Sequence, residues 1–192
     1  MYKTLKVTID GIAPLLMHNA RLNDPLDPMS VAIRKITTKK SKEKTQADLE
    51  MLARLEWEGG LYVDEENHPI IPGENLEGMI RDAAKKNRLG KQVLAGLMCD
   101  GVFRLKYDGP KSLDELWECG RFRDTRRAGV KGSGVMRTRP RFDKWGLSFT
   151  VSYMPDVLNK DSVIEAIKIG GRLIGLCDFR PKFGRFDVTK IE

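Results

Sequence analysis

Two segments of the chain alternate apolar and polar residues with a period of two, and this pattern constrains the fold more than any other feature. Residues 2–9 place leucine, valine and isoleucine on one side and threonine and lysine on the other, and residues 145–153 repeat the alternation. Such a period is typical of strands that bury one face and leave the other in water. The chain therefore needs other elements to cover the apolar face.

Helical periodicity supplies those elements between the strands. Apolar residues recur every three or four positions in 41–58, 74–87 and 161–169, and shorter helices are expected at 91–99 and 112–119. Further strands are expected at 61–63, 102–107 and 183–191. This order predicts an α+β fold with a mostly antiparallel sheet and helices on one face, and a ferredoxin-like or RRM-like core fits it. Such a core leaves one sheet face free, which can bind nucleic acid.

The length of 192 residues indicates one domain, so residues 1–192 are expected to form a single RRM-like domain. Two segments do not fit its core. Residues 19–60 are expected to be an inserted loop and helix, with Ser41 as a possible N-cap. Residues 120–144 are expected to be a basic hairpin with a flexible glycine-rich tip, extending from the core.

The positive charge of the chain is concentrated in this hairpin segment. The chain has 34 Lys and Arg against 27 Asp and Glu, a net charge of +7. Residues 120–145 hold nine basic and two acidic side chains, whereas the rest of the chain is neutral. A run of charge is often only a solvated surface, but the neutral remainder and the glycines within the run favour an anionic partner. The arginine fork suits phosphate.

The side chains expected to contact nucleic acid in this segment are Arg121, Arg123, Arg126, Arg127, Lys131, Arg137, Arg139 and Arg141. A second basic run at 34–44 adds Lys39 and Lys40.

Several classes of protein are excluded or disfavoured. No apolar run reaches the roughly 18 residues that a membrane helix needs, and the first residues contain no apolar signal core. Cys99, Cys119 and Cys177 are an odd number without C-x-x-C spacing, which argues against a disulfide framework and a structural zinc site. We therefore expect a cytoplasmic protein with no membrane contact, no metal site and no cofactor.

Two further segments resemble a known family. Residues 69–81, PIIPGENLEGMIR, resemble the P-x-IPG-S-S-L-K-G-x-x-R segment of the RAMP superfamily, the RRM-like proteins that form CRISPR effector backbones. Residues 170–186, GGRLIGLCDFRPKFGRF, look like the glycine-rich loop that leads into the final strand of that family. Glu74 and Glu77 depart from the small and basic residues more usual at those positions, which would weaken a phosphate contact there.

The resemblance implies an RRM-like palm, a protruding thumb at 121–142 and a second protruding loop at 19–44. It also implies head-to-tail assembly of copies along the backbone of a single-stranded guide RNA, together with other effector-complex subunits. The chain is short for a backbone subunit, so a minimal member or a relative encoded by a mobile element fits.

Two sites for phosphate follow from these motifs. Backbone amides at Gly73 and Asn75 would lie at a helix N-terminus, where orphan amides favour an anion, although an ordinary capped turn would use the same residues. In the glycine-rich loop the expected contacts are Arg172, Arg180, Lys182 and Arg185. The alternative for that loop is a helix cap and a packed turn with solvated arginines.

Catalysis is left open, with two candidate residues. The resemblance implies that His18 could act as a general base, and that Asp24 could support cleavage of RNA with Mg²⁺. Asp24 and Asp27 both precede proline, which is equally typical of turns. The alternatives to an RNA-binding assembly subunit are therefore a metal-dependent endoribonuclease and a basic interaction protein that docks on an acidic partner or effector complex.

Overall fold

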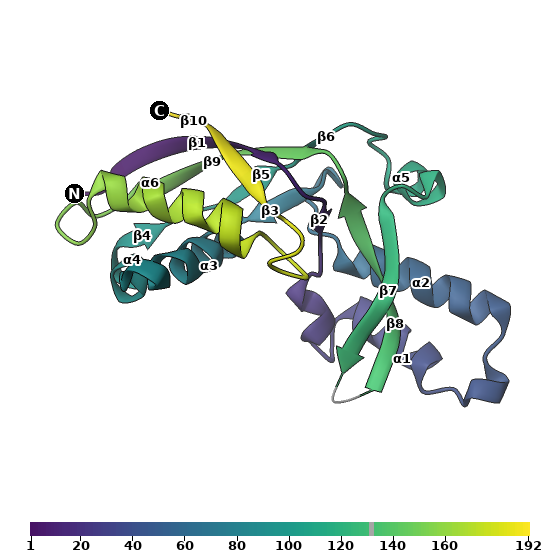
Figure 1. Ribbon diagram of the computed structural model, residues 1–192. Coiled ribbons are helices and arrows are strands. Elements are labelled where there is room, and N and C mark those ends of the chain that lie inside the picture. The colour runs from purple at the N-terminus through teal and green to yellow at the C-terminus, as the bar shows by residue number, and fades with distance from the viewer. Residues whose placement is uncertain (131–132) are drawn as a thin grey trace. The chain divides into compact units, whose positions relative to one another are not determined.

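The computed structural model describes residues 1–130 and 133–192 (Figure 1). Contacts within the chain divide it into two compact units. Unit 1 comprises Met1–Leu15, Val63–Gly109 and Phe142–Glu192, and unit 2 comprises Leu16–Tyr62 and Pro110–Arg141. Unit 2 thus contains residues 19–60 and most of 120–144, the two segments that we expected to lie outside the core.

Unit 1 is built on a five-stranded antiparallel sheet with the strand order β10-β1-β9-β4, in which β6 also pairs with β9. Its strands are β1 (Lys3–Gly11), β4 (Leu97–Met98), β6 (Lys106–Tyr107), β9 (Trp145–Tyr153) and β10 (Phe186–Ile191). The helices of this unit are α3 (Gly73–Ala84), α4 (Gly90–Gly96) and α6 (Lys160–Ile169), with a short 3-10 helix η3 (Lys85–Asn87) and a short π-helix η4 (Gly170–Ile174).

The alternation of the two long strands decides which face of this sheet is covered. Leu5, Val7 and Ile9 of β1 are buried, as are Leu147 and Phe149 of β9. The helices α3 and α6 pack together and lie on one side of these strands (Figure 1). The apolar stripes predicted from the sequence therefore meet at one interface, which is the core of unit 1.

The other face of β1 and β9 is polar. Outward positions of β1 and β9 carry serine, threonine, lysine, aspartate and glycine, and the Thr8 and Ser148 hydroxyls are 3.0 Å apart across the two strands. These two strands carry no aromatic side chain on this face, so they offer no platform on which bases would stack.

A second, two-stranded sheet leads into helix α3. The strands β3 (Ile70–Pro72) and β5 (Val102–Arg104) pair antiparallel, and Gly73 follows at once as the first residue of α3. A Cβ at Gly73 would lie 1.5 Å from the carbonyl oxygen of Cys99, so only glycine fits there. The Cys99 amide in turn donates to Glu77 Oε1 at 2.7 Å. Glu77, one of the departures from the family pattern, thus holds this turn to α3.

Unit 2 has its own helices and sheet. The helices are α1 (Pro28–Thr37), α2 (Gln46–Gly60) and α5 (Leu113–Cys119), with the short turns η1 (Ala20–Asn23) and η2 (Ser41–Glu43). The strands β2 (Leu15–Leu16), β8 (Ser133–Phe142) and β7 (Arg123–Val130) form a sheet in that order. The end residues Leu15 and Phe142 belong to unit 1.

Two tryptophans join α2 and α5 to the β7–β8 sheet. Trp57 of α2 is fully buried and donates Nε1–H to the Phe122 carbonyl at 2.7 Å. Its ring meets that of Trp117 of α5 edge to face, with centroids 5.5 Å apart. Arg54 lies over both rings and pairs with Asp114 at 2.6 Å.

The α+β class with antiparallel sheets is confirmed, and most predicted elements lie where the sequence placed them. Helix α1, however, was not predicted from the sequence, because the aspartates and prolines around its first turn are typical of a loop. The Asp27 side chain caps this helix by accepting a hydrogen bond from the Met29 amide at 2.8 Å, and Pro28 occupies the first helical position. Ser41 is not the cap of the next helix, because Thr45 forms a capping box with Asp48.

The expected strand at 61–63 is reduced to one bridge between Val63 and Pro69. In the part of the chain that the structure describes, no helix has the length and apolar character required to span a membrane.

Burial predicts a large effect of truncating one leucine of unit 1 and a small effect of truncating another. Leu147→Ala should lower the free energy of unfolding by about 2–5 kcal/mol, because Leu147 is fully buried and truncation leaves a cavity. Leu94→Ala, at a side chain 70% exposed, should change it by less than about 0.5 kcal/mol. Urea unfolding of both variants measures this, and equal losses would contradict the assignment of this core.

Candidate nucleic-acid interface

Charge separates the two units. Unit 2 holds 17 basic and 11 acidic side chains, whereas unit 1 holds 17 and 16. The net charge of the protein is therefore carried almost entirely by unit 2. Its arginines lie mainly on and beside β7 and β8, which pair antiparallel from Arg123 opposite Pro140 to Val130 opposite Ser133. That this pair protrudes as a thumb stays a prediction.

One face of the β7–β8 pair carries four arginines and the carboxylate of Asp124. Arg126 lies opposite Arg137 and Asp124 lies opposite Arg139, and residues two apart in a strand share a face. Arg141 follows on the same face. Asp124 is buried, and its carboxylate accepts hydrogen bonds from Arg126 and, at 3.1 Å, from Arg141.

These contacts change the acidity of Asp124. The hydrogen bond from Arg126 and the charges of Arg126 and Arg141 lower the pKa of the carboxyl, against the opposing effect of burial. The same hydrogen bond raises the pKa of Arg126. The carboxylate is thus held ionised, and it fixes two of the predicted RNA contacts in place.

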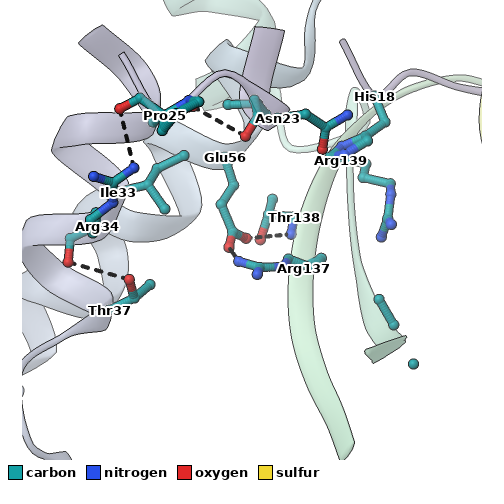
Figure 2. A pocket seen from close by; sticks show the side chains of 14 residues that line it. His18, Asn23, Pro25, Ile33, Arg34, Thr37, Glu56, Arg137, Thr138 and Arg139 are labelled. Carbon is teal, nitrogen blue, oxygen red and sulfur yellow. Dashed lines mark hydrogen bonds and ion pairs between the residues drawn. The ribbon is translucent and has the colours of Figure 1, made fainter. Parts of the chain in front are cut away.

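Glu56 of α2 supplies a second buried carboxylate to this face. One of its oxygens pairs with Arg137 Nη1, and the other accepts from the Thr138 amide at 2.9 Å (Figure 2). The helix and the strand are therefore joined through a charge that is 6% exposed. Sequence reasoning missed Glu56, because an isolated glutamate near the end of an amphipathic helix carries no signal of burial.

Three arginines of this region are exposed to solvent. The guanidinium of Arg121 lies 5.1 Å from the ring centroid of Phe122, and that of Arg123 lies 4.6 Å from that of Trp117. Arg127 lies across Gly134 of the neighbouring strand, since a Cβ there would be 1.7 Å from Arg127 Nε. These side chains keep their charge at the surface while neighbouring groups limit their motion. Lys131 lies outside the described residues.

A pocket of about 470 Å³ opens within unit 2 (Figure 2). Side chains from α1, α2, β7, β8 and the segment after β2 line it. Those with polar or charged groups include His18, Asn23, Arg34, Glu56, Arg137 and Arg139. Arg139 is 8% exposed, so a cationic group is buried in this wall. The structure thus brings two of the predicted RNA contacts together with His18, a weak catalytic candidate.

The carboxylates of Asp24 and Asp27, in the loop after β2, form contacts with residues close to them in the chain. Asp24 Oδ1 accepts from the Leu26 amide at 2.9 Å, and Asp27 caps α1 while pairing with Arg21 at 3.2 Å. These are the contacts of turns and helix caps. Asp24 is not among the residues that line the pocket with His18. Within 1–130 and 133–192 no three His, Cys, Asp or Glu residues gather closely enough to hold a metal ion.

The basic run at 34–44 is partly engaged in local contacts. Lys39 Nζ pairs with Asp48 at 2.7 Å, where Asp48 also closes the capping box of α2. The hydrogen bond from Lys39 lowers the pKa of Asp48. Lys40 precedes η2 and is exposed. A role of both lysines in RNA binding stays a prediction.

In unit 1 the glycines of the C-terminal loop serve close packing of the backbone. A Cβ at Gly171 would lie 2.3 Å from the Phe186 carbonyl oxygen, and one at Gly184, where φ is 71°, would lie 2.1 Å from that of Leu176. The Leu176 amide donates to Gly184 at 2.9 Å. The geometry matches the packed turn that we gave as the alternative interpretation of this loop.

The basic side chains of this loop surround the packed turn. Arg172 lies 3.5 Å from Asp187, and Arg180 lies 3.7 Å from Asp82 of α3. Lys182 and Arg185 are exposed.

The start of α3 meets the same loop. Asn75 Nδ2 lies 3.8 Å from Cys177 Sγ, a contact between the two segments that resemble the RAMP pattern. Burial raises the pKa of the Cys177 thiol to about 12, so the thiol stays protonated at neutral pH. The Gly73 amide donates to the Gly101 carbonyl at 2.9 Å. A phosphate at that amide would require this bond to open, and the predicted site there stays a prediction.

Comparison with known proteins finds similarity to solved structures. No family model and no curated protein sequence matches the chain. Among solved structures, the chain is similar to one chain of the cryo-EM structure of the Type III-B Cmr-beta bound to cognate target RNA, with a TM-score of 0.53 and 15% identity. The match covers 100% of this chain and 60% of that one, so this protein spans little more than half of its neighbour's length. The chain therefore has a fold distantly like that of part of this Cmr-beta chain.

The lowered pKa of Asp124 predicts a pH-dependent contribution to stability. A carboxyl with a lowered pKa stabilises the fold above its unfolded pKa of about 3.9, and this contribution is lost as the pH falls through the folded value. Asp124→Asn should therefore lower the free energy of unfolding by about 2 kcal/mol at neutral pH, and the difference from the natural protein should shrink below about pH 4.

Urea unfolding at several pH values measures this difference. Asp114→Asn is the control, because its side chain is 81% exposed and its pair with Arg54 should contribute less than about 1 kcal/mol. A loss for Asp124→Asn that persists undiminished in acid would contradict the electrostatic role.

Proposed function

We propose that this protein is an RNA-binding subunit of a CRISPR-type ribonucleoprotein. It binds single-stranded, guide-type RNA through the phosphate backbone, and copies of it assemble along the strand beside other subunits of the effector complex. The proposal assigns it no catalytic step, since the Asp24 carboxylate is engaged by its own turn.

The observation that carries the proposal is the concentration of charge in unit 2. A unit with six more basic than acidic side chains attracts a polyanion, and arginine is the residue best suited to phosphate. The exposed arginines 121, 123 and 127 are held over aromatic rings or along the neighbouring strand. Less side-chain entropy is therefore lost when phosphate binds.

The fold supports the same conclusion. The whole chain matches part of a subunit in a complex whose structure was determined with target RNA bound. The polar outer face of β1 and β9 offers no aromatic platform for bases, which favours contacts to the backbone over readout of sequence. We therefore expect binding with little sequence preference.

Light scattering of the purified protein at low salt, together with its ultraviolet absorbance ratio, tests the assembly. A large particle that absorbs as nucleic acid and collapses with RNase but not with DNase is the expected result. A monomer that gains no mass on addition of single-stranded RNA would overturn the proposal.

The exposed arginines should dominate the salt dependence of RNA binding. Replacing Arg121, Arg123 and Arg127 together by alanine should lower the slope of log K against log salt concentration by about 2, since each phosphate contact to a single strand contributes about 0.7. Fluorescence anisotropy with a labelled single-stranded RNA at several salt concentrations measures the slope.

A charge-matched control comes from unit 1. The exposed residues Lys86, Lys160 and Lys168, replaced together by alanine, remove the same total charge from the protein. Their slope should remain that of the natural protein. An equal drop in both triple variants would show that net charge alone, and not this surface of unit 2, governs binding.

A further inference from the structure

We propose that the pocket of unit 2 binds one nucleoside monophosphate, either as a free nucleotide or as a nucleotide of an RNA strand. This goes beyond the proposed binding of the RNA backbone, which uses the exposed arginines on and beside β7. The pocket is a separate site with its own lining (Figure 2).

The charge of the residues that line the pocket favours binding of an anion. Of the lining residues that the structure describes, Arg34, Arg137 and Arg139 contribute three cationic groups, and Glu56 contributes one carboxylate. Both oxygens of Glu56 are already engaged by β8, one by Arg137 and one by the Thr138 amide. Among the described residues that line the pocket, cationic side chains therefore outnumber carboxylates, and a phosphate monoester would balance this excess.

The remaining lining suits a nucleoside. Leu22, Ile33 and Ala128 provide apolar surface, and Asn23 and His18 provide groups that can both donate and accept hydrogen bonds. A phosphate alone would leave this surface uncovered. A ligand with a charged phosphate, a polar sugar and a flat aromatic base, whose faces are apolar and whose edges form hydrogen bonds, can contact all parts of this lining.

The size of the pocket agrees with such a ligand. Its volume of about 470 Å³ lies within the roughly 300–1,000 Å³ typical of small-molecule sites. A single inorganic anion would fill only a small part of it.

The cationic groups are also held in place before a ligand arrives. Arg34 Nη2 donates to the Pro25 carbonyl at 3.1 Å, and Arg137 is anchored by Glu56. The Ser30 hydroxyl donates to the Leu22 carbonyl at 3.1 Å and so fixes α1 to the preceding turn. Preorganised side chains of this kind are what a specific binding site requires.

Isothermal titration of the natural protein with each of the four ribonucleoside 5′-monophosphates tests the proposal, with inorganic phosphate and the unphosphorylated nucleosides as comparison ligands. We expect one site per chain and binding of at least one monophosphate at least tenfold tighter than binding of phosphate or of the matching nucleoside. No binding of any monophosphate would overturn the proposal, and so would phosphate that binds equally well.

Two neighbouring residues of α1 give a matched pair of variants. Arg34→Ala removes a charge that lines the pocket, and Lys35→Ala removes an equal charge from an exposed position that is not part of the lining. Arg34→Ala should weaken binding of the monophosphate at least tenfold, and Lys35→Ala should change it less than twofold. Equal losses would overturn the proposal. Neither residue is buried, so circular dichroism of both variants should match that of the natural protein.

Competition distinguishes the two sources of the nucleotide. If saturating monophosphate displaces bound RNA, the pocket receives a nucleotide of the strand, and if RNA stays bound, it receives a free nucleotide. RNA binding without binding of any monophosphate would refute only this inference. Binding of a monophosphate without binding of RNA would refute only the proposed function.

Discussion

Two buried carboxylates make the arginine-rich surface of unit 2 possible. Guanidinium groups on one face of two paired strands repel one another, and burying any of them is costly unless an opposite charge is present. Asp124 meets Arg126 and Arg141 from within the strand pair, and Glu56 meets Arg137 from helix α2. The charges are thereby partly compensated and firmly placed. The excess of arginine over acid that remains is what an anionic partner would neutralise.

Unit 1 follows a different physical rule. Its sheet is held by apolar burial against α3 and α6, and its C-terminal loop is held by backbone groups packed so closely that several positions accept only glycine. The glycines that resemble a phosphate-binding loop serve this packing. The side chains of Arg172, Arg180, Lys182 and Arg185 still surround the loop, so a contact to RNA there would come from side chains more than from backbone amides.

The elements with a clear period were predictable and the local exceptions were not. The strand at 145–153 and the helix at 161–169 agree with β9 and α6, because alternation and helical spacing report burial directly. Helix α1 escaped notice, since Asp27 and Pro28 are typical of turns as well as of helix starts. Counting charged residues along the sequence was enough to locate the excess of positive charge. Glu56 and Arg137, however, are 81 positions apart, and no local pattern reveals that they pair.

The sequence by itself determined the α+β class, the apolar faces of the long strands and the place where positive charge gathers, because each of these depends on residue type and short spacing alone. The tertiary structure decided which arginines are fixed by carboxylates and which are exposed. It also decided that the glycines of the last loop pack against backbone, and that side chains from α1, α2 and β8 enclose one pocket. Contacts such as Glu56 with Arg137 and Gly171 with Phe186 join residues far apart in the chain, and only folding brings these residues together.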